Sequence, residues 1–495
     1  MISHNEIEEL EKRTLCVNSI EEQFLKAKID DQGKIGSCHY CKERRKVTTI
    51  GQLANEIHGA FEQHYQLTAA EPSDLEYSLI KETGYVWWRE GEPIVNAIEQ
   101  AAEINEIVAE DIRKVLEYHH SGRYSVEIGG EGPYDEEAHY EDAELDDVEY
   151  RENWRSFENS LKTKSRFFSA EAEAVLDRIF ERLMELRSTD GKSVFVEAGP
   201  GTEMTVLYRA RVFQTLDELG EALKRPDVQI GPPPATLAKA GRMNANGIAV
   251  FYGATKSEIS ISEVRPPVGS QVVVGRFELI RKMRLLDVSV LRSAYVKGSV
   301  FDPTYIRRLE RAKFLRGLSE RISQPVMPDD EPLEYLVTQA IADYLAGKSD
   351  PEIDGIIYPS VQDSSGGSNV VLFHKSSRVE SIVLILGTEI DVQFGHQTEE
   401  GWETDYWVSE EIPPSKPEDS NEIDDDVIDF ARMTSHALSN VNDDDLRKTT
   451  LRLDLESLAV HHVEGARYET EAHSVTRHRW EKREFRLETR EYPDF

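Results

Sequence analysis

The spacing of apolar residues changes near residue 190, and this change limits the fold more than any other feature of the sequence. Before it, apolar residues recur at steps of three and four, as at Ile50, Leu53, Ile57 and Phe61, which is typical of amphipathic helices. From about 193 to 375, short runs of β-branched and aromatic residues lie between glycines, prolines and serines, which predicts strands mixed with helices. We therefore expect an α+β chain with a helical first part and a mixed α/β second part.

The length of 495 residues is more than one hydrophobic core usually organises, so several domains are expected. Composition divides the chain into a polar segment 1–47, a helical domain 48–190 with an acidic linker at 134–152, a mixed α/β domain 191–380, and a C-terminal extension with strands, 381–495. Strands are expected at 206–213, 247–254, 271–280, 354–361, 369–373, 381–394 and 449–460, and helices at 170–188 and 331–347.

The chain is strongly acidic, with a formal net charge of -35 and an isoelectric point near 4.8. Such a charge repels a phosphate backbone, so we do not expect a nucleic-acid partner, although 42–46 and 477–486 are locally basic. No apolar run approaches the roughly 20 residues of a membrane span, and the first residues carry no signal segment. Three cysteines in so long a chain favour a reducing compartment. We expect a cytoplasmic protein without membrane contact, either a monomer or a homo-oligomer.

All three cysteines lie in the first 47 residues: Cys16, Cys38 and Cys41. Cys38 and Cys41 have the C-x2-C spacing of one knuckle of a zinc ribbon, and Cys16 precedes them at a distance that suits a first knuckle. The second cysteine of that first knuckle is missing, because Ser19 stands in its place. A zinc ion would take its fourth ligand from His39, His4 or water. A degenerate ribbon without metal fits the sequence equally well.

In the α/β part, polar residues lie at or next to the ends of predicted strands. They are Arg209 in the strand 206–213, Arg242 and Asn244 in the turn 241–247, Tyr252 at the end of the next strand, Glu263 at the end of a short helix, and Ser360 in a turn rich in glycine and serine. Alternation along the first strand puts Arg209 and Arg211 on one face and Tyr208 on the other. Taken singly, each residue has an ordinary structural explanation, such as a solvated strand face or a turn.

Taken together and in this order, these stretches resemble the RES domain, a family named for its Arg, Glu and Ser. The resemblance rests on Y-R in a strand, the turn G-R-M-N-A-N-G, a tyrosine and a glutamate after it, and Y-P-S followed by G-G-S-N. It covers roughly residues 195–375. Met243 stands where phenylalanine or tryptophan is commoner, and Ser368 interrupts the usual G-G-L-N, but neither departure removes a group that carries chemistry.

The resemblance implies a fold similar to ADP-ribosyltransferases and the consumption of NAD+ as a substrate, typically by a bacterial toxin that a partner antitoxin protein restrains. The residue types suit this reaction. Breaking the nicotinamide–ribose bond develops positive charge on the ribose, which the carboxylate of Glu263 can stabilise. Arg209 and Arg242 can clamp the pyrophosphate through their guanidinium groups.

The remaining predicted residues complete a dinucleotide site. Tyr252 offers its ring to nicotinamide or its hydroxyl to ribose, and Ser360 and Asn244 can bond the cofactor. No P-loop or G-x-G-x-x-G spacing competes with this interpretation. Inorganic phosphate, water or a protein side chain could accept the ribose, and we favour phosphate or water.

The cysteine segment and the helices after it resemble the HEPN/RES N-terminal domain that precedes some RES domains, where two C-x-x-C pairs are usual. Ribonucleases of the HEPN fold use an R-x4-6-H motif, and Arg113 with His119 or His120 matches its spacing. Arginine and histidine are frequent on solvated helix faces, so we rank this interpretation second. Two alternatives to NAD+ degradation therefore stay open: a helical ribonuclease with an auxiliary RES domain, and a non-catalytic protein that binds ADP-ribose or a dinucleotide.

Overall fold

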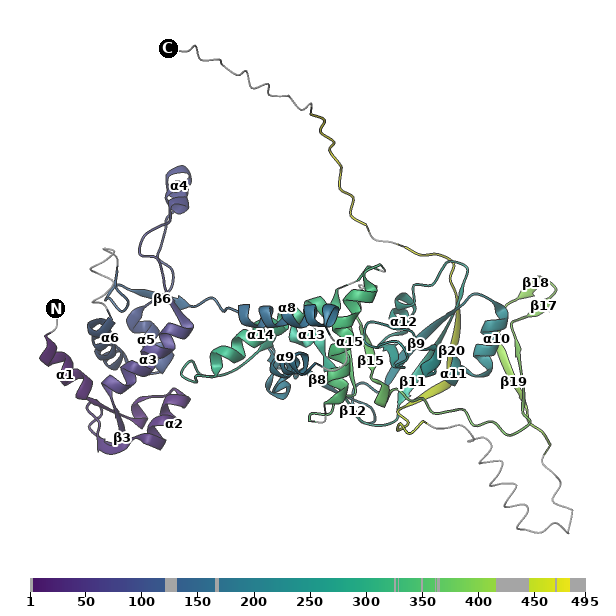
Figure 1. Ribbon diagram of the computed structural model, residues 1–495, viewed down its shortest axis with the longest axis horizontal. Helices are drawn as coiled ribbons and strands as arrows, with labels where there is room; N and C mark the ends of the chain where they lie inside the picture. The colour runs from purple at the N-terminus through teal and green to yellow at the C-terminus, as the bar shows by residue number, and fades with distance from the viewer. Residues whose placement is uncertain are drawn as a thin grey trace, which may run out of the picture.

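The computed structural model describes residues 3–120, 131–164, 169–414 and 445–480, apart from 325, 328, 349, 361, 363–365, 468 and 469. Most of the charged loop 413–426 and residues 481–486 of the basic C-terminal stretch lie outside the described residues. The protein is a mixed α+β chain with an N-terminal module, a helical layer and an eight-stranded sheet (Figure 1). Among the described residues, none of the helices combines the length and the hydropathy that a transmembrane span requires.

The N-terminal module packs helices against two small sheets. The apolar positions predicted to face one side of a helix do so: Ile50, Leu53, Ile57 and Phe61 are all at most 2% exposed and belong to one core. Thr49 begins that helix with a capping box to Gln52. The elements are α1 (His4–Lys12), β1 (Thr14–Cys16), α2 (Gln23–Gln32), β2 (Lys34–Ser37), β3 (Arg44–Thr49), α3 (Ile50–His64), β4 (Tyr65–Leu67), α4 (Asp74–Thr83), β5 (Glu92–Pro93), α5 (Ile94–Ala102), α6 (Glu106–His120) and β6 (His139–Asp142).

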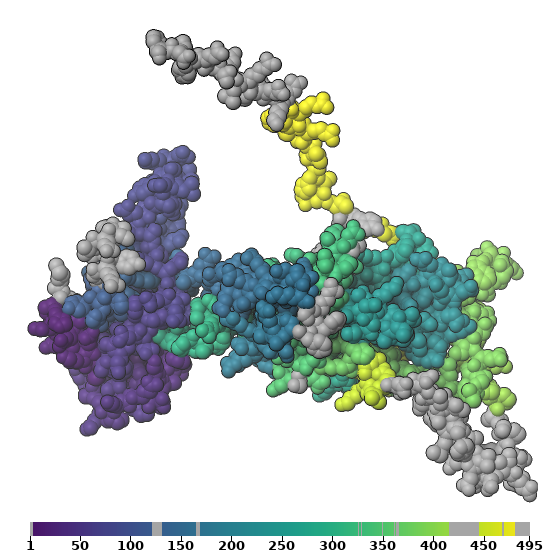
Figure 2. Space-filling model, viewed as in Figure 1, coloured from purple at the N-terminus to yellow at the C-terminus, as the bar shows by residue number. Residues whose placement is uncertain are grey.

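Helix α4 stands away from the rest of the module as an arm (Figure 2). It begins at the capping box of Ser73 and Glu76 and ends at Gly84, which takes a left-handed conformation. None of its residues is buried, and Leu75 is 74% exposed. A helix of ten residues is marginal in water without packing, so the arm depends on its caps and on the loops that carry it.

The acidic run 134–152 differs from the solvated linker that the sequence predicts. It contains strand β6 and the start of helix α8 (Val148–Thr163). Three tyrosines spaced through the run, Tyr134, Tyr140 and Tyr150, are each at most 7% exposed. The aromatic rings therefore anchor the run in two cores, while the carboxylates between them, apart from the buried Asp147, remain accessible to water.

Helices α8 and α9 (Ala170–Phe180) belong to the core of the second half, although they lie in the range 48–190 that the sequence groups with the N-terminal domain. Trp154 and Phe157 of α8 are 1% and 2% exposed, and the ring of Trp154 lies 5.7 Å from that of Phe314. The second half also contributes a residue to the first core, because Phe301 belongs to the N-terminal core. The cores therefore change between β6 and α8, and a cut at residue 190 would remove part of the second core.

The second half is built on one sheet of eight strands in the order β20-β11-β9-β10-β15-β14-β12-β8. All neighbours are antiparallel except β12 and β14. The strand that ends the sheet at one edge, β20, comes from the C-terminal extension. The strands are β8 (Phe195–Ala198), β9 (Val206–Phe213), β10 (Phe251–Ala254), β11 (Gln271–Leu279), β12 (Met283–Asp287), β14 (Gly355–Pro359), β15 (Ser368–Leu372) and β20 (Leu451–His462).

Helices cover this sheet, and small strand pairs form two-stranded sheets of their own. The helices are α10 (Leu216–Lys224), α11 (Pro226–Gln229), α12 (Ser257–Glu263), α13 (Val288–Leu291), α14 (Tyr305–Ser323) and α15 (Glu331–Gly347). The paired strands outside the main sheet are β7 (Arg187–Ser188) with β13 (Ala294–Tyr295), β16 (Glu389–Gln393) with β19 (Trp407–Glu411), and β17 (His396–Thr398) with β18 (Gly401–Glu403).

Three predicted elements are shorter in the structure. The helix expected at 170–188 ends at Phe180, because Glu181 is extended and Arg182 after it takes a left-handed conformation. The strand expected at 381–394 forms only at 389–393, and Val383 and Leu386 in its missing part are 80% and 76% exposed. The strand expected at 247–254 forms only at 251–254, because the residues before it leave the sheet.

Candidate active site

Arg209 lies where two neighbouring strands separate. Strand β9 pairs with β11 along its whole length, but its pairing with β10 is limited to Tyr208 and Ala254. Beyond that pair the strands diverge, and Arg209 spans the gap. Its Nη1 donates a hydrogen bond to the Tyr252 carbonyl at 3.0 Å, and its guanidinium carbon lies 5.2 Å from the centre of the Phe251 ring. The strand pairing thus fixes this side chain at the edge of an opening in the sheet.

Arg242 is held by the end of a helix. Its Nη1 and Nη2 donate hydrogen bonds to the carbonyls of Ile322 and Gln324, at 2.7 and 2.9 Å, where α14 ends. A cation at this position also interacts favourably with the helix dipole. The turn that carries it is tied to α15, since the carbonyls of Gly241 and Arg242 accept hydrogen bonds from side chains of that helix. Arg242 therefore has a fixed place opposite the sheet.

Asn244 and the hydroxyl of Tyr252 are used to build the turn. The Asn244 side chain is 4% exposed, and its amide donates to three backbone carbonyls. The Tyr252 hydroxyl donates to Asn244 Oδ1 at 2.8 Å and accepts from the Met243 N–H at 2.9 Å. Gly241 is required here, because a Cβ on it would lie 2.7 Å from the tyrosine oxygen. The hydroxyl of Tyr252 is therefore engaged within the protein, and only its ring is available to a ligand. Asn244 acts by positioning that ring.

Glu263 is oriented by two neighbours through one of its oxygens. Ser360 Oγ and Asn369 Nδ2 both donate to Glu263 Oε1, each at 2.7 Å. Within the described part of the chain, no hydrogen bond reaches the other oxygen, Oε2. Glu263 is the last residue of α12. Its two hydrogen-bond donors come from the turn after β14 and from β15. The arrangement fixes the carboxylate and leaves one oxygen for a ligand.

Four of the predicted residues line one cavity of about 430 Å³, and Asn244 is not among its lining residues. Arg209, Arg242, Tyr252 and Glu263 all line it, and Ser360 reaches it through its bond to Glu263. The lining side chains that the sequence analysis missed include Tyr335, Tyr358 and Asn369. The last two lie within the Y-P-S and G-G-S-N stretches, which contained the signal, whereas Tyr335 comes from α15 and has no local signal.

Arg209 and Arg242 have no carboxylate partner among the described residues, whereas the carboxylate of Glu263 is held by hydrogen bonds. Burial, with a smaller effect of Arg211, lowers the pKa of Arg209 to about 10, so its guanidinium stays charged at neutral pH. Neither Arg209 nor Arg242 forms an ion pair with any residue that the structure describes. In a chain of net charge -35, a cavity lined by three arginines, Arg209, Arg242 and Arg265, against the carboxylates of Glu263 and Glu331 indicates a site for an anionic ligand. The oriented carboxylate of Glu263 can stabilise positive charge in the same ligand.

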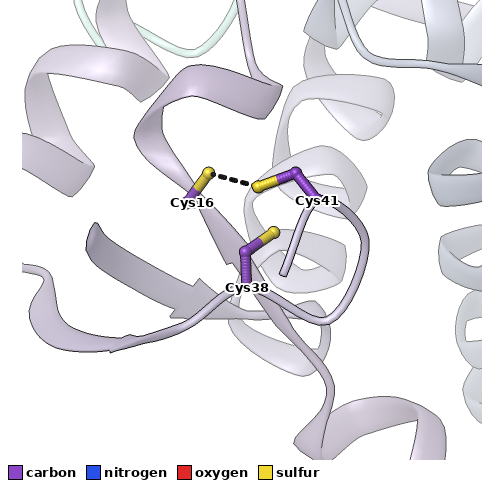
Figure 3. Close-up of side chains that lie close together, drawn as sticks. All are labelled: Cys16, Cys38 and Cys41. Carbon is purple, nitrogen blue, oxygen red and sulfur yellow. Dashed lines mark hydrogen bonds between the residues drawn. The ribbon is translucent and has the colours of Figure 1, made fainter. Parts of the chain in front are cut away.

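The three cysteines form a compact cluster in the N-terminal module (Figure 3). Their sulfur atoms all lie within 4.8 Å of one another, and Cys16 Sγ and Cys41 Sγ are 3.5 Å apart. Zinc–thiolate bonds of about 2.3 Å in a tetrahedron place sulfurs about 3.8 Å apart, so this cluster could hold a zinc ion. Burial raises the pKa of the Cys38 thiol, but backbone N–H donors outweigh this effect and lower it to about 7. No histidine among the described residues joins the cluster.

Ser19 lies beside the cysteine cluster. Its Oγ is 3.4 Å from Cys16 Sγ and 3.8 Å from Cys38 Sγ. His4, one of the expected fourth ligands, is engaged elsewhere by Tyr118 and Glu8. The fourth position therefore falls to the serine hydroxyl or to a water molecule.

We expect the purified chain to carry about one zinc ion, and Ser19→Cys to tighten its binding at least about tenfold, because a fourth thiolate completes the tetrahedron. Chelator competition and metal analysis measure both values. Cys38→Ser is the matched loss variant and should release the metal. A wild-type chain without zinc, in which Ser19→Cys acquires one ion per chain, would instead identify a ribbon that has lost its metal.

The residues of the R-x4-6-H motif are engaged in other contacts. Arg113 is 4% exposed and forms ion pairs with Glu110 and Glu117, both at 2.8 Å. His119 Nε2 lies 2.6 Å from Glu11 Oε1. The ring of His120 stacks on that of His58 at 3.7 Å, and burial, together with the charges of nearby histidines, lowers the pKa of His120. The three side chains hold the module together, so we do not propose a ribonuclease site here.

Comparisons with known families agree with the resemblance found in the sequence. Residues 207–394 match the RES domain, and residues 31–175 match the HEPN/RES N-terminal domain 1. The chain therefore contains a RES domain preceded by an HEPN/RES N-terminal domain. The residues that line the cavity all fall inside the first match. Searches of curated proteins and of solved structures found no match.

Proposed function

We propose that this protein cleaves the nicotinamide–ribose bond of NAD+, as a glycohydrolase or a phosphorylase. The observation that carries the proposal is the oriented carboxylate of Glu263, which shares one cavity with two unpaired guanidinium groups. NAD+ has the matching charges, since its pyrophosphate is anionic and its ribose becomes cationic as the bond breaks. Membership of the RES family supports the same choice.

In the proposed reaction, Arg209 and Arg242 bind the pyrophosphate, and the Tyr252 ring supports the nicotinamide. The bond between ribose C1 and the nicotinamide nitrogen breaks, and its electron pair neutralises the pyridinium, so nicotinamide leaves uncharged. Glu263 Oε2 stabilises the ribose cation electrostatically. Ser360 and Asn369 act through Glu263 by fixing the carboxylate, so they are positioning residues. A fold similar to ADP-ribosyltransferases is part of this proposal.

The acceptor is water or inorganic phosphate. Water adds its oxygen to C1 and releases a proton to solvent, which gives ADP-ribose. Phosphate adds an oxygen instead, which gives ADP-ribose 1-phosphate. Incubation of the full chain with NAD+ in phosphate and in phosphate-free buffer, with product identification, tests the proposal and separates these outcomes. Tight binding of NAD+ without nicotinamide release would instead support the non-catalytic alternative.

We further propose that the N-terminal module restrains a toxic activity, because Phe301, at the start of the RES helical layer, is buried in the core of that module. A chain beginning at residue 145 keeps α8 and α9 and should harm a bacterial host more than the full chain. A chain beginning at 190 should fail to fold, because losing buried aromatic residues such as Trp154 and Phe157 costs about 3–5 kcal/mol each. Growth assays and thermal unfolding measure these effects.

The control for the toxicity comparison is Glu263→Gln in the chain that begins at 145, which should be harmless. Equal harm from the full and shortened chains would contradict the restraint but not the activity. If neither chain causes harm, a toxic role is contradicted, and NAD+ cleavage in vitro is then judged by itself.

A further inference from the structure

A second cavity of about 610 Å³ adjoins the first. The two cavities share Arg209, Ala210, Tyr252 and Val264, so Arg209 stands between them. The second cavity exists because β9 and β10 diverge after their single pair, which leaves the far half of β9 without a partner on that side. The segment 228–239 forms the opposite wall.

The wall of this cavity exposes apolar side chains that nothing in the described chain covers. Leu237 is 69% exposed and Val228 is 47% exposed, and Pro233 and Pro234 lie beside them in the lining. Exposed apolar side chains around a cavity of this size are typical of a small-molecule site. Such an apolar surface suits a planar ring system.

The charge of the lining points to an anionic ligand. Arg209, Arg211 and Lys239 line the cavity, and no aspartate or glutamate is among its described lining residues. This composition stands out in a chain with 93 acidic and 58 basic residues. A ligand that fits has an anionic linkage near Arg209 and a planar base against Leu237, and continues into the first cavity.

We propose that the second cavity binds the adenosine half of the dinucleotide, with the pyrophosphate at Arg209 and the nicotinamide half in the first cavity. This inference rests on the proposed function. It implies that the enzyme recognises the base at a subsite remote from the bond that breaks. Nicotinamide mononucleotide, which has the same scissile bond but no adenosine, should therefore be a poor substrate.

The test compares Leu237→Glu with the matched control Leu216→Glu, which also changes an exposed leucine but lies outside both cavities. A carboxylate at 237 should lower kcat/KM for NAD+ at least about tenfold by disfavouring the base and its phosphate. It should leave nicotinamide release from nicotinamide mononucleotide unchanged. Leu216→Glu should change neither. An equal effect of Leu237→Glu on both substrates, or no effect on NAD+, would overturn the inference.

A binding measurement keeps this inference separate from the proposed function. ADP is titrated into the full chain by calorimetry, where no bond is broken. Weaker ADP binding in Leu237→Glu than in Leu216→Glu supports the subsite even if NAD+ is not cleaved. Failure of the wild-type chain to bind ADP overturns the subsite, even if NAD+ is cleaved.

Discussion

Replacing Glu263 with glutamine is expected to lower the rate of nicotinamide release at least about 10³-fold, with little change in stability. Glutamine keeps the shape of the side chain, and its carbonyl oxygen can still accept the hydrogen bonds from Ser360 and Asn369. The negative charge is lost, and an amide NH2 group takes the place of Oε2. Since that charge is needed where the ribose becomes cationic, the loss should appear in kcat and only weakly in NAD+ binding.

Glu258→Gln is the matched control, because Glu258 lies in the first turn of the same helix, is exposed, and does not line the cavity. It should retain full activity. Nicotinamide release is measured by product analysis, and stability by urea unfolding, which should shift by less than about 1 kcal/mol. If Glu263→Gln stays active and folded, another group carries the chemistry.

The sequence predicts those elements whose first and last residues are determined by local composition. Strand β9 and helix α15 begin and end where they are expected, at 206–213 and 331–347. The strand expected at 247–254 is different, because residues 247–250 have strand composition but lie where β10 diverges from β9. Whether a strand finds a partner depends on the whole sheet, and local composition does not encode it.

The candidate site was predictable where its residues lie in local motifs, and not where it depends on the tertiary structure. The order of the motifs identified Arg209, Arg242, Tyr252 and Glu263, which line one cavity, because each motif is local and keeps its position in the chain. The motifs did not reveal that the Tyr252 hydroxyl and the Asn244 amide are already occupied by the turn. They also did not reveal the second cavity, which depends on the separation of two strands and on a loop that carries no motif.

The two arginines of the cavity should respond differently to replacement. Arg209→Met is expected to weaken binding of ADP-ribose at least about 100-fold, because it removes the cation that stands between the two cavities. The same change should leave the free energy of unfolding unchanged or raise it by about 1–2 kcal/mol, because a half-buried cation without a carboxylate partner is replaced by an apolar side chain. Water in the cavity can replace its hydrogen bond to the Tyr252 carbonyl.

Arg242→Met should instead lose both binding and stability, since Arg242 donates hydrogen bonds to two carbonyls at the end of α14. We expect a loss of about 1–3 kcal/mol in the free energy of unfolding, measured by urea denaturation alongside calorimetry with ADP-ribose. Arg284→Met, which removes an ion pair with exposed Glu197 outside the cavity, is the control and should change neither value much. A large loss of stability in Arg209→Met, with binding intact, would show that its charge serves the fold and that the anion site lies elsewhere.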